Sequence, residues 1–297
     1  MKCDLCPRKC LVDRKKGEKG ICGQTENLKV ARAALHFWEE PCISGDAGSG
    51  AVFFSGCSLH CVFCQNENIA NGTVGKEISL ERLVDIFLEL QEKRANNINL
   101  VTPGHFVPQI VKALDQARRE GLTLPVVYNT SSYETVDTIK MLEGCVDIYL
   151  PDFKYMSPVL SKKYSHAPDY AQVAKAAIAE MVRQTGKAVF VNGDEDNLIL
   201  SGTIVRHLTL PGCMADSIQI LKYLHETYGD MIYISIMNQF TPLSNLEKYP
   251  ELNRRITDEE YETLVDYAID IGIENGFIQE GDTAEESFIP AFDCEGV

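Results

Sequence analysis

From residue 51 onward, short apolar runs alternate with longer segments in which apolar residues recur at helical spacing. Strands are predicted for the runs at 51–55, 98–101, 125–128, 146–150, 204–210 and 232–237. Helices are predicted for 79–94, 106–119, 133–142, 169–184, 215–228 and, behind a capping box that starts at Thr257, 257–271. Strands that alternate with such helices predict β-α units on a parallel sheet.

Six such units are too few to close an eight-stranded barrel, so the pattern predicts an α/β fold that is either a partial barrel or an open doubly wound sheet. The runs at 188–191 and 198–200 flank Asn192-Gly193-Asp194, which predicts a hairpin-like insertion. In both architectures, ligands bind at the carboxyl ends of the parallel strands.

Polar segments follow these strands at the predicted ligand-binding rim. They are residues 56–64, Thr102-Pro103-Gly104-His105, 129–132, Pro151-Asp152-Phe153-Lys154, Arg206-His207 and Asn238-Gln239. Because parallel strands end at one edge of a sheet, we expect these segments to converge on one rim.

Charge and composition exclude some classes of partner. The formal net charge is −15, which disfavours nonspecific binding to nucleic acid and to anionic membranes. No run approaches the roughly 20 apolar residues of a membrane span. The N-terminal residues lack the apolar core of a secretion signal, so we expect a cytoplasmic protein. Eleven cysteines in a reducing compartment favour metal binding or catalysis over disulfides.

One group of cysteines follows the first predicted strand. Cys57, Cys61 and Cys64 have the spacing C-x3-C-x2-C on one short loop. Three thiolates so placed can hold three irons of a cubane iron–sulfur cluster and leave the fourth iron open to a small molecule. The alternatives are a zinc half-site, for which His60 would be the fourth ligand, and three buried thiols.

A second group lies at the N-terminus. Cys3, Cys6, Cys10 and Cys22 supply a complete four-thiolate set, which suits zinc or a second iron–sulfur cluster. Residues 1–30 are too few to fold on apolar burial alone, so a metal is expected to organise them. The alternative is unliganded thiols on a flexible segment. We expect residues 31–50 to be a linker and 281–297 to be an acidic C-terminal tail.

The C-x3-C-x2-C motif, with Phe63 before its last cysteine and a strand before its first, resembles the signature of the radical S-adenosylmethionine superfamily. The chain is further similar to the branch around pyruvate formate-lyase activating enzyme, with an extra N-terminal cysteine module. That likeness is carried by Cys3-x-x-Cys6-Pro7-Arg8-Lys9-Cys10, Gly20-Ile21-Cys22-Gly23, Glu40-Pro41-Cys42-Ile43-Ser44-Gly45 and Leu150-Pro151-Asp152-Phe153-Lys154-Tyr155. The resemblance implies a partial (β/α)6 TIM-like barrel over residues 51–280.

The resemblance also implies an activity. Cys57, Cys61 and Cys64 would hold a [4Fe-4S] cluster whose fourth iron binds S-adenosylmethionine. Reductive cleavage would give a 5′-deoxyadenosyl radical that abstracts hydrogen, with flavodoxin or ferredoxin as electron donor. The substrate would be a glycyl residue of a partner enzyme. Alternatives are another peptide, a small metabolite, or a non-catalytic iron–sulfur or zinc scaffold.

The resemblance assigns further residues to S-adenosylmethionine. Gly104 would let the backbone approach the methionyl amino group, although the acid that relatives carry in this turn is absent. Asn129 and Ser131 would bind the ribose hydroxyls.

Three charged residues complete the implied site. Lys154 would pair with the methionyl carboxylate, and Arg206 would meet the carboxylate or the ribose. Asp152, with Asn129 nearby, would hold a monovalent cation, which some relatives use.

Overall fold

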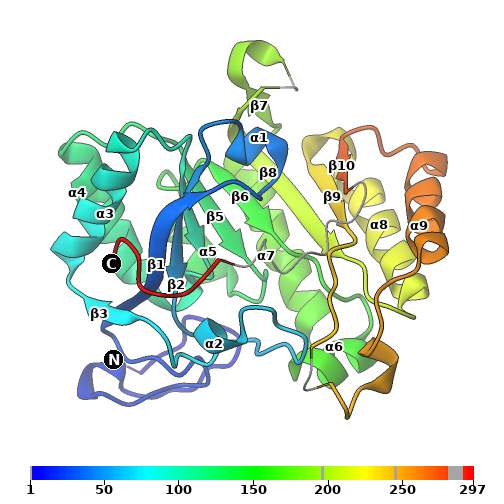
Figure 1. Ribbon diagram of the computed structural model, residues 1–297, viewed down its shortest axis with the longest axis horizontal. Coiled ribbons are helices and arrows are strands. Elements are labelled where there is room, and N and C mark those ends of the chain that lie inside the picture. The colour runs from blue at the N-terminus through cyan, green and yellow to red at the C-terminus, as the bar shows by residue number, and fades with distance from the viewer. Residues whose placement is uncertain (1, 195–196, 244–245, 280–289) are drawn as a thin grey trace.

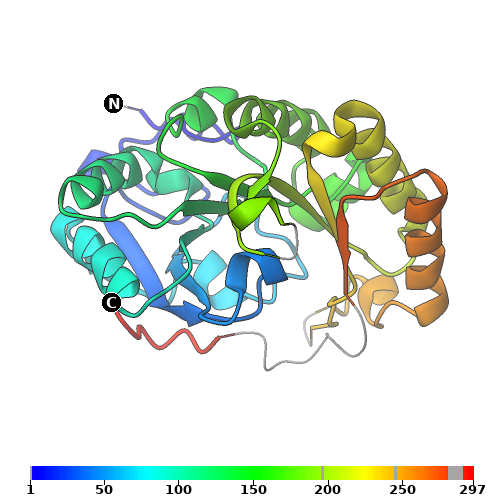
Figure 2. The same cartoon turned by 90° about the horizontal axis from the view of Figure 1, so that it is seen from above.

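The chain folds around one long, curved sheet. The computed structural model describes residues 2–194, 197–243, 246–279 and 290–297, and Figure 1 shows their arrangement. Within these residues the sheet has ten strands in the order β10-β9-β8-β6-β5-β4-β2-β1-β3, and β7 pairs with β8 beside this path. Seen from above, the longer helices lie around the outside of the sheet (Figure 2). The predicted α/β partial barrel is confirmed.

All six predicted strands are present and parallel. They are β2 (Ser49–Phe54), β4 (Ile98–Val101), β5 (Val126–Thr130), β6 (Ile148–Pro151), β8 (Ile199–Leu208) and β9 (Tyr233–Met237). Every residue of β2, β4, β5, β6 and β9 is buried. Strands covered on both faces need continuous apolar runs, which is why the runs were readable in the sequence. A further parallel strand, β10 (Gly276–Ile278), pairs with β9 and was not predicted.

The helices follow the predicted periodicity. They are α3 (Leu80–Glu92), α4 (Val107–Arg119), α5 (Val136–Lys140), α7 (Tyr170–Thr185), α8 (Met214–Tyr228) and α9 (Asp258–Asp270), with the short α1 (Pro41–Ser44), α2 (Glu67–Ala70) and α6 (Pro158–Ser165). The capping box is present at Thr257 and Glu260. Helix α5 is shorter than predicted, because Thr135 caps it and the Glu134 side chain turns inward to accept hydrogen bonds from Tyr128 and Thr130.

The segment expected to be a linker is partly regular structure. Strand β1 (Leu28–His36) pairs antiparallel with β2, and β3 (Lys76–Ile78) pairs antiparallel with β1. Helix α1 lies at the end of the sheet opposite to α2 and α6 (Figure 1). Strand β1 was missed because its run, LKVARAALH, mixes charged residues with alanines and lacks a clear alternation. The domain boundaries at 30, 50 and 280 stay predictions.

The described C-terminal residues run beside β1. The backbone N–H of Ala33 donates to the carbonyl of Glu295 (2.8 Å), and that of Cys294 donates to the carbonyl of Ala31 (3.1 Å). Arg32 forms ion pairs with Asp293 and Glu295. These contacts occupy the stretch of the β1 edge that β3 leaves uncovered. The first part of the predicted acidic tail, 281–289, lies outside the described residues.

The N-terminal residues form an irregular module at the same end of the sheet as α2 and α6 (Figure 1). Its one short helical turn is η1 (Arg14–Lys16). Arg14 is buried, and its guanidinium donates to the carbonyls of Thr25 and His105. The module is therefore anchored to the turn that follows β4. No helix in the described parts of the chain is long and apolar enough to cross a membrane.

The insertion predicted at 188–200 is a short antiparallel pairing. Strand β7 (Val189–Phe190) pairs with the start of β8, as the hairpin-like pattern indicated. Residues 195–196 of this insertion lie outside the described residues.

Candidate active site

A cavity of about 450 Å³ opens where the strands end. The structure places around it eight residues that the sequence analysis singled out, which are Cys57, Cys61, Cys64, Asn129, Ser131, Asp152, Lys154 and Arg206. Apolar side chains from several elements complete the wall, among them Leu59, Phe63 and Phe240. The cavity thus combines thiols, paired charges and apolar surface in one space.

The thiols are carried on the loop that follows β2. Gly56 starts the loop with a φ of +95°, and a Cβ there would lie 2.5 Å from the carbonyl oxygen of Cys22, so only glycine fits. Leu59 and Phe63 are buried and anchor the loop, with the Phe63 ring 5.9 Å from the Phe240 ring in an edge-on contact. The loop is therefore held by packing on both sides of Cys61.

Two of the thiols accept hydrogen bonds at sulfur. The Ser165 hydroxyl donates to Sγ of Cys61 (3.0 Å), and the Leu59 N–H donates to Sγ of Cys57 (3.4 Å). Burial nevertheless raises the pKa of Cys61 and raises that of Cys64 to about 12. Thiols in such surroundings give up their protons when a metal replaces them, because metal ligation deprotonates a thiol outright.

The donor set fits an iron–sulfur cluster. Cys57 is near enough to act on the pKa of Cys61, and both act on the pKa of Cys64; all three line the cavity. Among the described residues, the side chains are not drawn together into a closed metal-ligand group. His60, the candidate fourth zinc ligand, instead directs Nε2 to the carbonyl of Ile21 (2.8 Å) in the N-terminal module. Three thiols without a nearby imidazole suit iron–sulfur ligation better than zinc.

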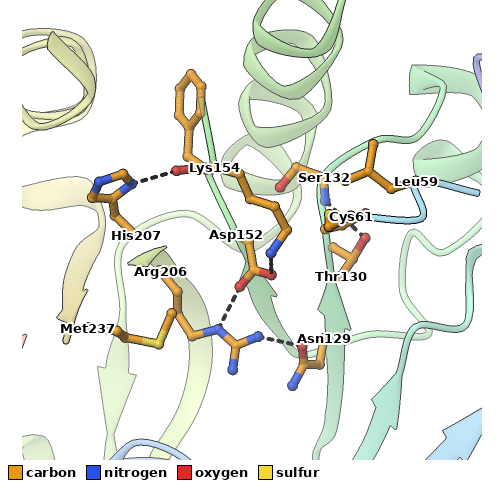
Figure 3. Close-up of polar contacts among 12 residues, drawn as sticks. Leu59, Cys61, Asn129, Thr130, Ser132, Asp152, Lys154, Arg206, His207 and Met237 are labelled. Carbon is orange, nitrogen blue, oxygen red and sulfur yellow. Dashed lines mark hydrogen bonds and ion pairs between the residues drawn. The ribbon is translucent and has the colours of Figure 1, made fainter. Parts of the chain in front are cut away.

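A charged network spans the ends of β5, β6 and β8 (Figure 3). Asp152 accepts from Nζ of Lys154 at Oδ2 (2.6 Å) and from Nε of Arg206 at Oδ1 (2.9 Å). Arg206 also donates to Oδ1 of Asn129 (2.7 Å) and pairs with Oε2 of Glu39 (3.0 Å). The charges of two acids and two bases balance, so the network is neutral in the absence of a ligand.

Burial and charge act in opposite directions on these groups. Burial alone would raise the pKa of Asp152, but the charges of Arg206 and Lys154 outweigh it and hold that pKa below its usual range. Burial alone would likewise lower the pKa of Lys154, and Asp152 outweighs it, so that the pKa of Lys154 lies above its usual range. The side chains of Asp152, Lys154 and Arg206 therefore stay charged at neutral pH.

The sequence analysis missed two acids of this cavity, Glu39 and Glu40. Oε1 of Glu39 accepts from the side-chain amides of Asn99 (3.0 Å) and Asn129 (3.1 Å). Glu40 is buried, its pKa is raised chiefly by burial, and within the described residues its Oε2 has no hydrogen-bond partner. Both acids directly precede α1, which lies at the end of the sheet opposite to α2 and α6. Glu39 and Arg206 are distant in sequence, and the fold brings them together. The sequence offers two signals: an acidic pair before Pro41, a pattern also typical of solvated surface, and the segment Glu40-Pro41-Cys42-Ile43-Ser44-Gly45, which carries part of the family likeness but was given no role in the site.

The remaining predicted positions lie apart from the charged network. Gly104 is absent from the cavity wall, and a Cβ there would lie 2.9–3.1 Å from the carboxylate of Glu134. Thr102 lines the cavity with a φ of +55°, a strained value for a β-branched residue. His105 is buried, and its Nε2 lies 2.7 Å from the carbonyl oxygen of Ser55. The proposed contact of Gly104 with an amino group stays a prediction.

The monovalent-cation prediction fits the observed arrangement poorly. Both carboxylate oxygens of Asp152 are held by the cationic groups of Lys154 and Arg206, and Oδ1 of Asn129 accepts from Arg206. A cation placed between Asp152 and Asn129 would face these two positive charges at hydrogen-bond range, which is electrostatically unfavourable.

The four N-terminal cysteines lie within one small module. Burial, and to a smaller extent the charges of the other three thiols, raise the pKa of Cys6 to about 12; burial also raises the pKa of Cys22. The Ile21 N–H donates to Sγ of Cys10 (3.3 Å). As at the first site, the described side chains do not form a closed metal-ligand group. The donor chemistry, four thiols within one small module, suits a thiophilic metal.

Comparison with known proteins gives a family for this fold and site. Residues 51–197 match the Radical SAM superfamily. An uncharacterized protein of Methanocaldococcus jannaschii is 27% identical over 275 residues, which cover 90% of this chain and 74% of the relative.

Two solved structures share the fold. Methylornithine synthase has a TM-score of 0.52 at 13% identity, with 80% of this chain and 66% of that chain covered. A maturase of the [FeFe]-hydrogenase has a TM-score of 0.51 at 15% identity, with 76% of this chain and 50% of that chain covered. The match over residues 51–197 includes the three-cysteine loop and the ends of β4 to β6. This chain is therefore an enzyme of the Radical SAM superfamily.

Proposed function

We propose that this enzyme binds S-adenosylmethionine at a [4Fe-4S] cluster on Cys57, Cys61 and Cys64 and cleaves it reductively. The observation that carries the proposal is the single cavity that contains both the three thiols and the Asp152–Lys154–Arg206 network. A cluster held by these three thiols would supply the one electron needed to break the sulfonium–C5′ bond, which would give methionine and a 5′-deoxyadenosyl radical able to take a hydrogen atom from the substrate. The electron comes from a protein donor such as flavodoxin or ferredoxin.

The protein's own residues bind and orient the nucleoside. Lys154 uses one of its three N–H donors on Asp152, which leaves donors for the methionyl carboxylate. Asn129 and Ser131 line the cavity and offer an amide and a hydroxyl for the ribose diol. Arg206 is engaged by Asp152, Asn129 and Glu39, so its first task is to hold those side chains in place. Apolar residues around the thiols keep water from the reacting atoms.

The test is an anaerobic assay of the reconstituted chain. Wild type is expected to bind about four irons for this cluster and, after reduction with dithionite, to release 5′-deoxyadenosine and methionine from S-adenosylmethionine. Cys57→Ala is the informative variant, and Cys145→Ala, far from the cavity wall, is the matched control. Equal, negligible yields from wild type and Cys57→Ala would refute the proposal.

For the hydrogen donor, we propose a glycyl residue of a partner enzyme. The support is the Asp152-x-Lys154 element, which resembles the activating enzymes and lines the cavity here. Incubation with candidate glycyl-radical partners should give a protein radical detected by electron paramagnetic resonance. Deuterium transfer into 5′-deoxyadenosine from a labelled peptide or metabolite, without a glycyl radical, would assign the reaction to another substrate.

We further propose that Cys3, Cys6, Cys10 and Cys22 bind zinc or a second iron–sulfur cluster. The support is that each of the other three thiols acts on the pKa of Cys6 within a module that has little apolar core of its own. Metal analysis of wild type and of Cys6→Ser in the full chain distinguishes the cases. Loss of one zinc assigns zinc, loss of about four irons assigns a second cluster, and no loss refutes the site.

A further inference from the structure

The side chain of Arg8, in the N-terminal module, contacts the three-cysteine loop. Its guanidinium uses all three nitrogens on carbonyl oxygens: Nε donates to Ser58 (2.9 Å), one terminal nitrogen to Ser165 (3.0 Å) and the other to His166 (2.6 Å). Ser58 lies inside the three-cysteine loop, whereas Ser165 and His166 lie at the C-terminal end of α6. Arg8 therefore joins two segments that are more than a hundred residues apart in sequence.

The end of α6 is itself tied to the loop. The Val62 N–H donates to the carbonyl of Tyr164 (2.8 Å), and the Ser165 hydroxyl, which also contacts the Tyr155 hydroxyl (2.8 Å), donates to Sγ of Cys61. The carbonyls that end a helix carry partial negative charge, so a guanidinium is stabilised there. Arg8 thus holds the group that orients Cys61, and it holds the loop on the other side of the same thiol.

The position of Arg8 depends on the module. Arg8 stands between Cys6 and Cys10, and its guanidinium also lies over the Tyr133 ring, 5.1 Å from the ring centre. A second contact of the module, from the carbonyl of Ile21 to the ring of His60, touches the loop next to Cys61. The fold of the module and the geometry of the loop are therefore mechanically connected.

We propose that Arg8 is a positioning residue that fixes the three-cysteine loop against the C-terminal end of α6, so that the N-terminal module sets the exposure and orientation of Cys61. This inference rests on the proposed cluster only for its effect on iron, since the loop geometry exists without it. Partners outside the ligand shell change metal affinity or activity by about 10- to 100-fold when they are removed. Ser165 lies in that position, because it donates to Cys61, and Arg8 acts on Cys61 by holding Ser165.

The experiment compares three full-length variants with wild type. Arg8→Ala removes the contacts, Arg8→Lys keeps the charge but loses the three-nitrogen fork, and Lys15→Ala removes an exposed cation of the same module as a control. In the metal-free chain, the rate at which iodoacetamide modifies Cys61 is followed by peptide mass spectrometry. In the reconstituted chain, we would record the rate of iron loss to a chelator and the electron paramagnetic resonance spectrum of the reduced cluster.

In Arg8→Ala, iodoacetamide is expected to modify Cys61 faster than in wild type, and iron is expected to be lost about 10- to 100-fold faster. Both rates for Arg8→Lys should lie between those of Arg8→Ala and wild type. Lys15→Ala should match wild type in both rates. If Arg8→Ala does not fold by circular dichroism, Arg8→Lys decides. Rates for the Arg8 variants equal to those of Lys15→Ala would overturn the proposal. The alkylation rate tests the role of Arg8 without a cluster. If wild type binds no cluster and makes no 5′-deoxyadenosine, the proposed function is refuted, but the proposal for Arg8 is still tested by the alkylation rate.

Discussion

Replacement of Glu39 by glutamine tests whether the charged network is held from the α1 end of the fold. The Glu39 side chain is 8% exposed, and its Oε2 lies 3.0 Å from Arg206. Glutamine keeps Oε1 as an acceptor for the amides of Asn99 and Asn129 but places an N–H2 group against the guanidinium. Breaking a buried ion pair costs about 3–5 kcal/mol, and we expect about 3 kcal/mol here because Asp152 still pairs with Arg206.

The assay is urea unfolding of the metal-free chain, followed by circular dichroism at pH 7. A fall in the midpoint at unchanged slope reports a loss of stability and not a change in the surface exposed on unfolding. Glu92→Gln, on the exposed end of α3, is the matched control and should lie within about 0.5 kcal/mol of wild type. If Glu39→Gln unfolds at the same urea concentration as Glu92→Gln, the network does not depend on Glu39 and the reasoning fails.

Two further changes test buried contacts near the site. His207 donates or accepts at both ring nitrogens, to the Phe153 carbonyl (2.8 Å) and the Ser217 hydroxyl (2.9 Å), and burial lowers its pKa to about 4. As pH falls through about 6.5, the unfolded chain binds a proton that the native chain does not. Between pH 6.5 and 5, wild type should therefore lose about 1.6 kcal/mol more than His207→Asn; parallel urea profiles would contradict this. Gly104→Ala should destabilise the chain by about 1–3 kcal/mol, because its Cβ would press on the Glu134 carboxylate, and an unchanged unfolding midpoint would show that the turn yields.

The strands of the barrel were predictable because their burial requires a continuous run of apolar residues, which is visible in a short stretch of sequence. Runs such as Ile98–Val101 and Val126–Thr130 are covered on both faces, so each residue had to be apolar or hydrogen-bonded. Strand β10, with three residues of which two are exposed, carries too short a signal to be recognised. Strand β1 was missed for a different reason, since its edges are completed by β2, by β3 and by the C-terminal residues, none of which its own sequence specifies.

The candidate site likewise has features that the local sequence predicts and features that it does not. The spacing of Cys57, Cys61 and Cys64 and the strand before them are local features, and they led to the Radical SAM assignment that the comparisons support. The sequence also brought Asp152, Lys154 and Arg206 to one rim, because strand ends meet at one edge. It gave no means to foresee that Arg206 would pair with Asp152.

By itself, the sequence determined the alternation of strands and helices, the three-cysteine loop and the rim on which the polar strand ends gather, since each is set by residues within a few positions of one another. The tertiary structure alone decided that Glu39 completes the network across 167 residues and that Arg8 joins the cysteine loop to α6 across more than a hundred. The physical reason is that the chemistry of a polar side chain limits which groups it can bind but does not determine which of them lies beside it in the folded protein. Its partner is chosen when packing of the barrel brings distant segments together and burial makes every unpaired polar group costly.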